Sequence, residues 1–237
     1  MSFQISLSSK STVVVREYED GIDLCGPYEV GLKHFVFWNT IYNVTNENNV
    51  LKFINGQKEY TIIVNSGVYE LDDLITRINT DHICVLHTGT YIQLVKNSLK
   101  MKVFSQWNID FTVKNSIGKL FGFSSRMIPK NTYAFSDLPV DIFSINSIKI
   151  HCNLVCTNIE DLKKNVNTLY EFPLDHSQIG GKVIKEPNPV NYFCVNTTDK
   201  IYKLVITITD QSNKLLDFRG ESINLTLDFR PVNGVSN

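Results

Sequence analysis

The 237-residue sequence predicts an all-β protein with one short amphipathic helix. Two segments near the C-terminus, IYKLVITITD and ESINLTLDF, alternate apolar and polar residues with the two-residue period of a half-buried strand. Asn, Gly, Ser and Pro separate many other short apolar segments, as in a meander of strands. Only residues 69–79 carry apolar side chains at helical spacing.

The composition favours a folded protein and names no partner. Hydrophobic residues make up 43% of the chain, which is enough to build a core, and 23 basic residues balance 24 acidic ones. Because no long run of one sign occurs, we expect nucleic-acid contact to be absent or indirect. The chain shows neither a signal-peptide pattern at its start nor about 18 uninterrupted apolar residues, so neither secretion nor a membrane span is expected.

The cysteines indicate a reducing compartment. The chain contains five of them, an odd number at scattered positions, so buried thiols are expected rather than a disulfide framework. They are Cys25, Cys84, Cys152, Cys156 and Cys194.

We expect two parts along the chain: an N-terminal arm with a turn over residues 1–27, and a single domain over 28–237. The arm is Ser-rich and then punctuated by Gly and Pro. The domain begins with YEVGLKHFVFWNTIYNV, whose apolar residues on both faces predict a long strand covered on both sides. LKFINGQKEYTIIV follows and predicts two strands joined by a turn at Asn55–Gly56.

Residues 69–79 predict the helix, because their apolar side chains recur at i, i+3, i+4 and i+7. These are Leu71, Leu74, Ile75 and Ile78. Asp72 and Asp73 are adjacent, so on a helix their side chains point about 100° apart and do not form a catalytic pair. Acidic residues in a first turn interact favourably with the helix dipole.

The middle of the chain predicts further short strands. HICVLH, YIQLVK, MKVFSQW and IDFTV are expected to be strands, SIGKLFGF a helical turn, and INSIKIHCNLV another strand. Residues 156–198 are the least regular segment, with Gly–Gly, Pro187 and Pro189 marking loops, and are expected to provide surface contacts.

The corner between the last two strands contains a cluster of charged residues that includes Asp210, Asp217, Arg219 and Glu221. We expect Tyr202, Leu204, Ile206 and Ile208 to share the inner face of the first strand. Beyond the turn, Leu216 and Phe218 have even numbers, whereas the core set Ile223, Leu225, Leu227 and Phe229 has odd numbers. A β-bulge with Gly220 at positive φ would keep all six side chains inward.

Asp217, Arg219 and Glu221 are the predicted subunit-interface residues, because they lie at the rim of the sheet. An exposed ion pair there contributes only about 0–1 kcal/mol, so its expected role is to orient a contact within the chain or with a neighbouring copy. Arg219-Gly220-Glu221 also differs by one methylene from an Arg-Gly-Asp adhesion triplet, but the longer acid changes the ligand geometry.

No catalytic or metal site is predicted. His82, Cys84 and His87 form one candidate group and His151, Cys152 and Cys156 another, yet neither spacing supplies a full tetrahedral zinc site. Asn115–Lys119 lacks the upstream glycine and following hydroxyl residue of a phosphate-binding loop, and no nucleophile elbow or dinucleotide motif occurs. We therefore expect no cofactor and no enzymatic activity.

Four segments together resemble a family of viral capsid proteins: GPYEVGLKHFVFWNTIYNVTNENN at 26–49, GVYELDDLITRIN at 67–79, LFGF at 120–123 and DQSNKLLDFRGESINLTLDF at 210–229. In this order they are similar to the penton, or minor capsid, proteins of Polinton/Maverick elements, adintoviruses and virophages. The resemblance implies a single jelly-roll, a sandwich of two four-stranded antiparallel sheets.

The same resemblance implies a role for the chain. Five copies would close around the vertex of an icosahedral capsid and meet a double jelly-roll major capsid protein, so the protein would reside in the virion. We expect no insertion large enough for a receptor-binding domain. The alternatives are a non-catalytic binding module, either a trimeric ligand or a carbohydrate-binding domain, which exposed aromatics along one groove would favour, and an enzyme, which would need a polar pocket.

Overall fold

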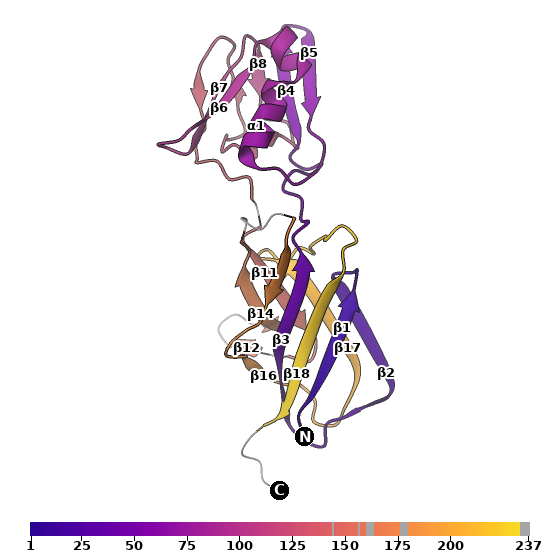
Figure 1. Cartoon of the computed structure of the whole chain (residues 1–237). Coiled ribbons are helices and arrows are strands. Elements are labelled where there is room, and N and C mark those ends of the chain that lie inside the picture. The colour runs from indigo at the N-terminus through magenta and orange to yellow at the C-terminus, as the bar shows by residue number, and fades with distance from the viewer. Residues whose placement is uncertain (144, 156, 160–163, 176–179, 233–237) are drawn as a thin grey trace. The chain divides into compact units, whose positions relative to one another are not determined.

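The computed structural model describes residues 1–143, 145–155, 157–159, 164–175 and 180–232, without the side chains of 157–159 and 164–166. The chain forms two compact units (Figure 1). Unit 1 consists of Met1–Ile41 and Ile145–Asn237, and unit 2 of Tyr42–Ser144. The sequence predicted one domain over 28–237 without a large insertion. In the structure, unit 2 is such an insertion, since it interrupts unit 1 and has its own core.

Unit 1 contains two antiparallel sheets. In the first sheet, β1 (Phe3–Ser9) pairs with β18 (Ile223–Pro231), and β18 pairs with β3 (Tyr28–Trp38). The other edge of β3 pairs with two short strands in turn, β15 (Lys182–Lys185) and β16 (Tyr192–Cys194). The second sheet has the order β14 (Thr168–Pro173), β11 (Ser147–Cys152), β17 (Lys200–Asp210) and β2 (Val13–Asp23). Figure 1 shows β3, β18 and β1 side by side.

The strand order of unit 1 is that of a jelly-roll. We count β15 and β16 as one interrupted strand and number the eight strands of the two sheets from 1 to 8 along the chain. Read across each sheet, the order is then 1-8-3-6 in the first sheet and 5-4-7-2 in the second. This arrangement of two interleaved Greek keys confirms the predicted single jelly-roll sandwich of two four-position sheets. A small hairpin of β12 (Thr157–Ile159) and β13 (Lys164–Val166) also belongs to the 145–237 segment.

Residues 1–27 are not a separate arm, because they supply β1 to one sheet and β2 to the other. The alternation in β1 is inconspicuous in the sequence because its outward residues are Gln and Ser and only one inward residue, Leu7, is fully buried. Both strands lie at the edge of a sheet, where one face and one flank remain open.

The core of unit 1 lies between the two sheets. Phe35 and Phe37 of β3 are both fully buried, and each ring centroid lies 6.1 Å from that of Phe172 on β14, in the opposite sheet. Such aromatic pairs contribute beyond the area that they bury. The expected long strand is therefore confirmed as β3, but it is not covered on both sides, because Lys33 and Trp38 on its outer face are exposed.

Tyr202 does not share the inner face of β17, as the sequence predicted. The register of β17 against β2 shifts between Ile201 and Lys203, so Ile201 is buried (1% exposed) and Tyr202 faces solvent (56% exposed). The remaining predicted core residues, Leu204, Ile206 and Ile208, are fully buried. The irregularity lies opposite Gly21, whose φ of +68° lets β2 bend.

Unit 2 also contains two small sheets. One has the order β5 (Lys58–Ile63), β4 (Val50–Asn55), β8 (Asn108–Asp110) and β9 (Met127–Ile128). The other has the order β10 (Ala134–Phe135), β7 (Lys100–Phe104) and β6 (Tyr91–Val95). The core of this unit includes the fully buried side chains of Phe53, Leu74, Ile78, Ile92, Met101 and Phe121.

Several local predictions in unit 2 are confirmed. The helix is α1 (Leu71–Asn79), which buries Leu74 and Ile78 and carries Asp72 and Asp73 in its first turn. The hairpin turn at Asn55–Gly56 joins β4 and β5, with Gly56 at a φ of +62°. The helical turn is η2 (Ile117–Lys119), where the hydroxyl of Ser116 accepts a hydrogen bond from the backbone N–H of Gly118. Among the described residues, no helix is long and apolar enough to cross a bilayer.

The predicted strand HICVLH is instead a π-helical segment, η1 (Ile83–Thr88). The carboxylate of Asp81 accepts a hydrogen bond from the backbone N–H of Ile83 at 3.0 Å, which favours a helical start. The segment ends at Gly89, which has a φ of +55°. A short run of β-branched and apolar residues does not distinguish a strand from a buried helical turn.

Candidate functional site

In the charged corner between β17 and β18, the carboxylate of Asp210 accepts hydrogen bonds from the backbone of the turn that follows it. Asp210 is 9% exposed, and its Oδ1 accepts hydrogen bonds from the backbone N–H groups of Ser212 (2.7 Å) and Lys214 (2.9 Å). Because its carboxylate closes the turn between β17 and the return segment, Asp210 has a structural role.

The predicted bulge at Gly220 is a turn that precedes β18. Arg219 and Gly220 have φ values of +57° and +79°, and the N–H of Glu221 donates to the carbonyl of Phe218 at 3.0 Å. Two successive residues with positive φ in a four-residue turn are typical of type I′. The turn shifts the alternation by one residue, so the predicted inward side chains are all buried: Leu216, Phe218, Ile223, Leu225, Leu227 and Phe229.

Asp217 and Arg219 pair with each other on the surface of this turn. The Nη1 of Arg219 lies 3.1 Å from the Oδ2 of Asp217, and the Arg219 backbone N–H donates to Oδ1 at 2.8 Å. The side chain of Arg219 is 39% exposed and that of Asp217 is 65% exposed, so the ion pair contributes about 0–1 kcal/mol to stability. Glu221 is also exposed. Three charged side chains therefore lie at one solvent-facing turn, and their contact with another subunit stays a prediction.

The described members of the two histidine and cysteine groups are not arranged to hold a metal ion. Cys84 is fully buried, and burial raises the pKa of its thiol to about 12, whereas His82 and His87 are exposed with ring centroids 6.3 Å apart. His151 is half-buried between the hydroxyls of Thr209 (2.9 Å) and Thr168 (3.2 Å). Burial raises the pKa of the Cys152 thiol to about 11.

Cys156 lies outside the described residues. Within the part of the chain that the structure describes, no three His, Cys, Asp or Glu side chains are placed to hold a metal ion.

Two apolar patches lie on the outer faces of the sandwich, and the sequence did not predict them. On the first sheet, Trp38 (42% exposed) and Ile184 (54% exposed) flank Val36, which they leave only 7% exposed; we name these three residues the tryptophan patch. Val36 is the cross-strand partner of Ile184, and Trp38 follows on the same face of β3.

The other patch lies on the second sheet. Val13 (38% exposed) and Val15 (49% exposed) of β2 lie beside Val205 of β17, the cross-strand partner of Val15; we name these three the valine patch. The alternation of Val13 and Val15 was visible in the sequence but fell within the expected arm.

A polar hollow of about 690 Å³ lies on the outer face of the first sheet, beside the loop between β15 and β16. Polar side chains dominate its lining and include Gln4, Ser6, Lys33, His34, Glu186 and Thr226. The Nε2 of His34 lies 3.6 Å from the Oε1 of Glu186, and the hydroxyls of Ser6 and Thr226 lie 3.1 Å apart. These polar side chains pair with one another across the strands. The pairs do not place a nucleophile next to a general base.

Comparison with known proteins finds a similar fold and no related sequence. No family model matches the chain, and no curated protein matches its sequence. Among solved structures, the SeMet-labelled mavirus penton protein superposes with a TM-score of 0.53 at 15% sequence identity. The superposition covers 98% of this chain and 100% of the mavirus chain. At this identity the match shows a common fold, and it confirms the resemblance to penton proteins at that level.

Proposed function

We propose that this chain, which shares its fold with a penton protein, is a penton-like vertex subunit of an icosahedral capsid from a double-stranded DNA virus or virus-like element. The observation that carries the proposal is the superposition on the mavirus penton protein over the whole of that chain. The jelly-roll strand order of unit 1 supports it independently, because this architecture recurs in capsid proteins. In this role the protein acts through its shape, without a cofactor or catalytic residue.

A ring of five identical copies requires two different contact surfaces on each copy, because only a heterologous interface closes around a five-fold axis. The tryptophan patch and the valine patch meet this requirement, since they lie on opposite sheets of the same sandwich. Exposed apolar side chains at neighbouring positions are typical of protein interfaces. We propose that the tryptophan patch of one copy packs against the valine patch of the next.

Asp217, Arg219 and Glu221 are proposed to orient this contact. Their turn lies at the end of the sandwich, and the ring of Phe218 within it lies 5.2 Å from that of Phe37 in the core. Because the turn is anchored to the core, its charges have defined positions. Charge pairs at the rim of an interface affect association rate and partner selection more than affinity.

The remaining partner in this proposal is a major capsid protein of the double jelly-roll type, which would surround the ring at the vertex of the virion. A second candidate function is a non-catalytic binding module on the jelly-roll scaffold. The observation that favours it is a solvent-facing row of aromatic side chains in unit 2, at Tyr91, Phe104 and Tyr133. The two functions are compatible, because they use different units of the chain.

Native mass spectrometry with negative-stain imaging of the purified chain tests the proposal. We expect five-fold rings, whereas trimers would favour the ligand-like module and a monodisperse monomer at the highest soluble concentration would contradict a ring made by this chain alone. Val15→Asp and Ile184→Asp should each dissociate the ring, because each places a charge in an apolar contact. Ile63→Asp is the matched control, since Ile63 is 62% exposed on β5 of unit 2.

A further inference from the structure

The three-stranded sheet of unit 2 has one face in the core and one aromatic face toward solvent. Ile92 of β6 and Met101 and Val103 of β7 are buried (0–1% exposed), so the residues between them point outward. The side chains that face outward or lie directly beside them are Tyr91, Gln93, Val95, Lys100, Lys102, Phe104, Tyr133 and Phe135; we name this set the aromatic face.

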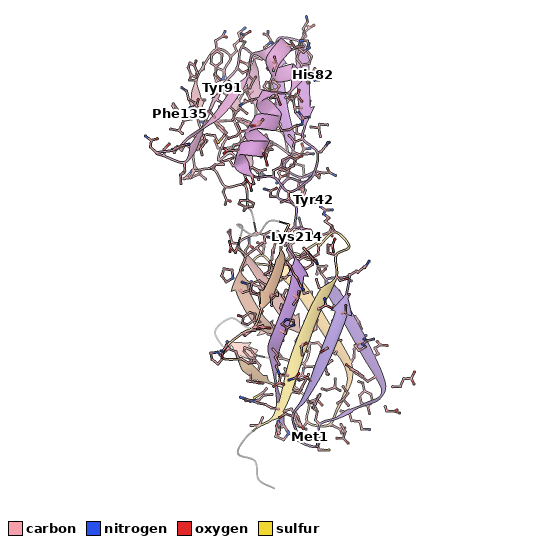
Figure 2. The ribbon with its side chains drawn as sticks, viewed as in Figure 1. Met1, Tyr42, His82, Tyr91, Phe135 and Lys214 are labelled. Carbon is pink, nitrogen blue, oxygen red and sulfur yellow. The ribbon has the colours of Figure 1, made fainter. Side chains whose placement is uncertain are left out.

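The aromatic residues form a row across the strands. Tyr91 is the cross-strand partner of Phe104, and the ring centroid of Tyr133 lies 4.8 Å from that of Phe104. Tyr91, Tyr133 and Phe135 are 54%, 62% and 50% exposed, which is unusual for large aromatic side chains. Figure 2 shows Tyr91 and Phe135 on the same side of unit 2. Since neighbouring strands are about 4.8 Å apart, three of them span roughly 10 Å, which accommodates two sugar rings.

Two lysines add positive charge to this face. The Nζ of Lys102 lies 4.3 Å from the ring centroid of Tyr133 and 6.0 Å from that of Phe135. Lys100 lies one pleat further along β7 and faces the same way. Within the described residues neither lysine pairs with a carboxylate. The face is therefore complementary to a ligand that combines flat apolar surfaces with negative charge.

We propose that the aromatic face binds an acidic glycan, a saccharide with carboxylate or sulfate groups. The C–H faces of the sugar rings stack on Tyr91, Phe104 and Tyr133, and an acidic group pairs with Lys102. The side-chain amide of Gln93, the cross-strand partner of Lys102, is positioned to hydrogen-bond a sugar hydroxyl. Exposed planar side chains with few rotatable bonds bind at a low cost in conformational entropy.

Charge argues against single-stranded nucleic acid, the other ligand that stacks on aromatic sheets. A phosphodiester chain requires a basic groove that follows its backbone, and such binding strengthens with the number of phosphates neutralised. Of the basic side chains described next to these rings, Arg126 donates to the carbonyl of Phe135 and pairs with Asp137, which leaves Lys100 and Lys102, a match for one or two acidic groups. This inference does not depend on the ring proposed above, because it concerns unit 2 alone.

Saturation-transfer NMR on the full chain tests the proposal with two matched pairs of probes: sialyllactose against lactose, and a hyaluronan hexasaccharide against chitohexaose. We expect at least one acidic probe to bind and its neutral counterpart to bind about tenfold more weakly, because a charge-assisted hydrogen bond is lost. Lys102→Ala should reduce binding to a similar extent, and Tyr133→Ala and Phe135→Ala should reduce it further. These positions are at the surface, so the variants should fold normally.

Tyr202→Ala and Lys58→Ala are the controls, as an exposed tyrosine in unit 1 and an exposed lysine on β5, and both should bind like the unmodified chain. The proposal is overturned if neither acidic probe binds, or if acidic and neutral probes bind equally. It is also overturned if the Lys102 and Tyr133 variants bind normally. Binding of a twelve-nucleotide oligo(dT) that the same substitutions abolish would replace the glycan with nucleic acid.

Discussion

The hydroxyl of Thr40 donates a hydrogen bond to the backbone carbonyl of Phe218 at 2.8 Å. This bond joins the segment that follows β3 to the charged turn between β17 and β18, across 178 residues of sequence. The turn is therefore fixed at two points, by this bond and by the packing of Phe218 against Phe37. A turn held in this way presents its charges in one geometry.

Gly220→Ala should destabilise unit 1 by about 1–2 kcal/mol, the usual cost of an L-residue in the left-handed region. Gly220 has a φ of +79°, and a Cβ there would meet nothing within 4 Å, so the cost comes from the backbone alone. The check is urea unfolding followed by the fluorescence of Trp38, with Trp107 replaced by Phe so that unit 1 alone reports. Ser222→Ala, two residues further on, should have little effect.

An unchanged urea midpoint for Gly220→Ala would mean that the turn relaxes to a different conformation. Such a result would also weaken the proposal that Asp217, Arg219 and Glu221 orient a subunit contact. A direct check on that proposal is Arg219→Glu, which should slow ring assembly and leave the fold of unit 1 intact.

Leu74→Ala should destabilise unit 2 by about 2–5 kcal/mol, because it opens a cavity where a fully buried side chain of α1 packs. The two units have separate cores, so the unfolding of unit 1 should not change. With one tryptophan in each unit, Trp38→Phe and Trp107→Phe variants report each transition separately. A coincident shift of both transitions would show instead that the units unfold together.

Stability should fall as the pH drops below about 6.5, the unperturbed histidine value, because of His151. Burial, followed by the positive charge of Lys149, lowers the pKa of His151 in the folded chain. Between the unfolded and folded values the unfolded chain binds the additional proton, so acidification favours unfolding there, and no effect is expected above that window. Urea midpoints at pH 7.5 and 5.5 test this, and His151→Gln should show a smaller difference than the unmodified chain.

Iodoacetamide at about pH 8 should label Cys25 and Cys194 in the folded chain and Cys84 and Cys152 only after unfolding. The first two are exposed, whereas the last two are buried with raised pKa values, so the reagent reaches only the first two in the folded chain. A hydrogen bond to the carboxylate of Asp23 raises the pKa of Cys25, so Asp23→Asn should accelerate its labelling. Peptide mass spectrometry assigns each site, and rapid labelling of Cys84 would contradict its buried position in η1.

Local patterns predicted the elements that depend on near neighbours. The spacing of Leu71, Leu74, Ile75 and Ile78 fixed α1, and Asn55–Gly56 fixed the hairpin, because both depend on residues only a few positions apart. At the corner, the parity of Leu216 and Phe218 against the β18 core set predicted a positive φ at Gly220. The same pattern did not distinguish a bulge from a turn, since both devices insert one residue into the alternation.

The sequence by itself determined that the chain is all-β with one amphipathic helix, where its central strands lie, and that its fold resembles that of penton proteins. Tertiary structure decided the rest. In the structure, residues 3–9 and 13–23 form edge strands, and Tyr42–Ser144 forms a separate unit. Trp38, Ile184 and the aromatic face of β6, β7 and β10 are exposed to solvent. The physical reason is that alternation shows only that a strand has two different faces, whereas the partners that it meets far along the chain decide which face is buried.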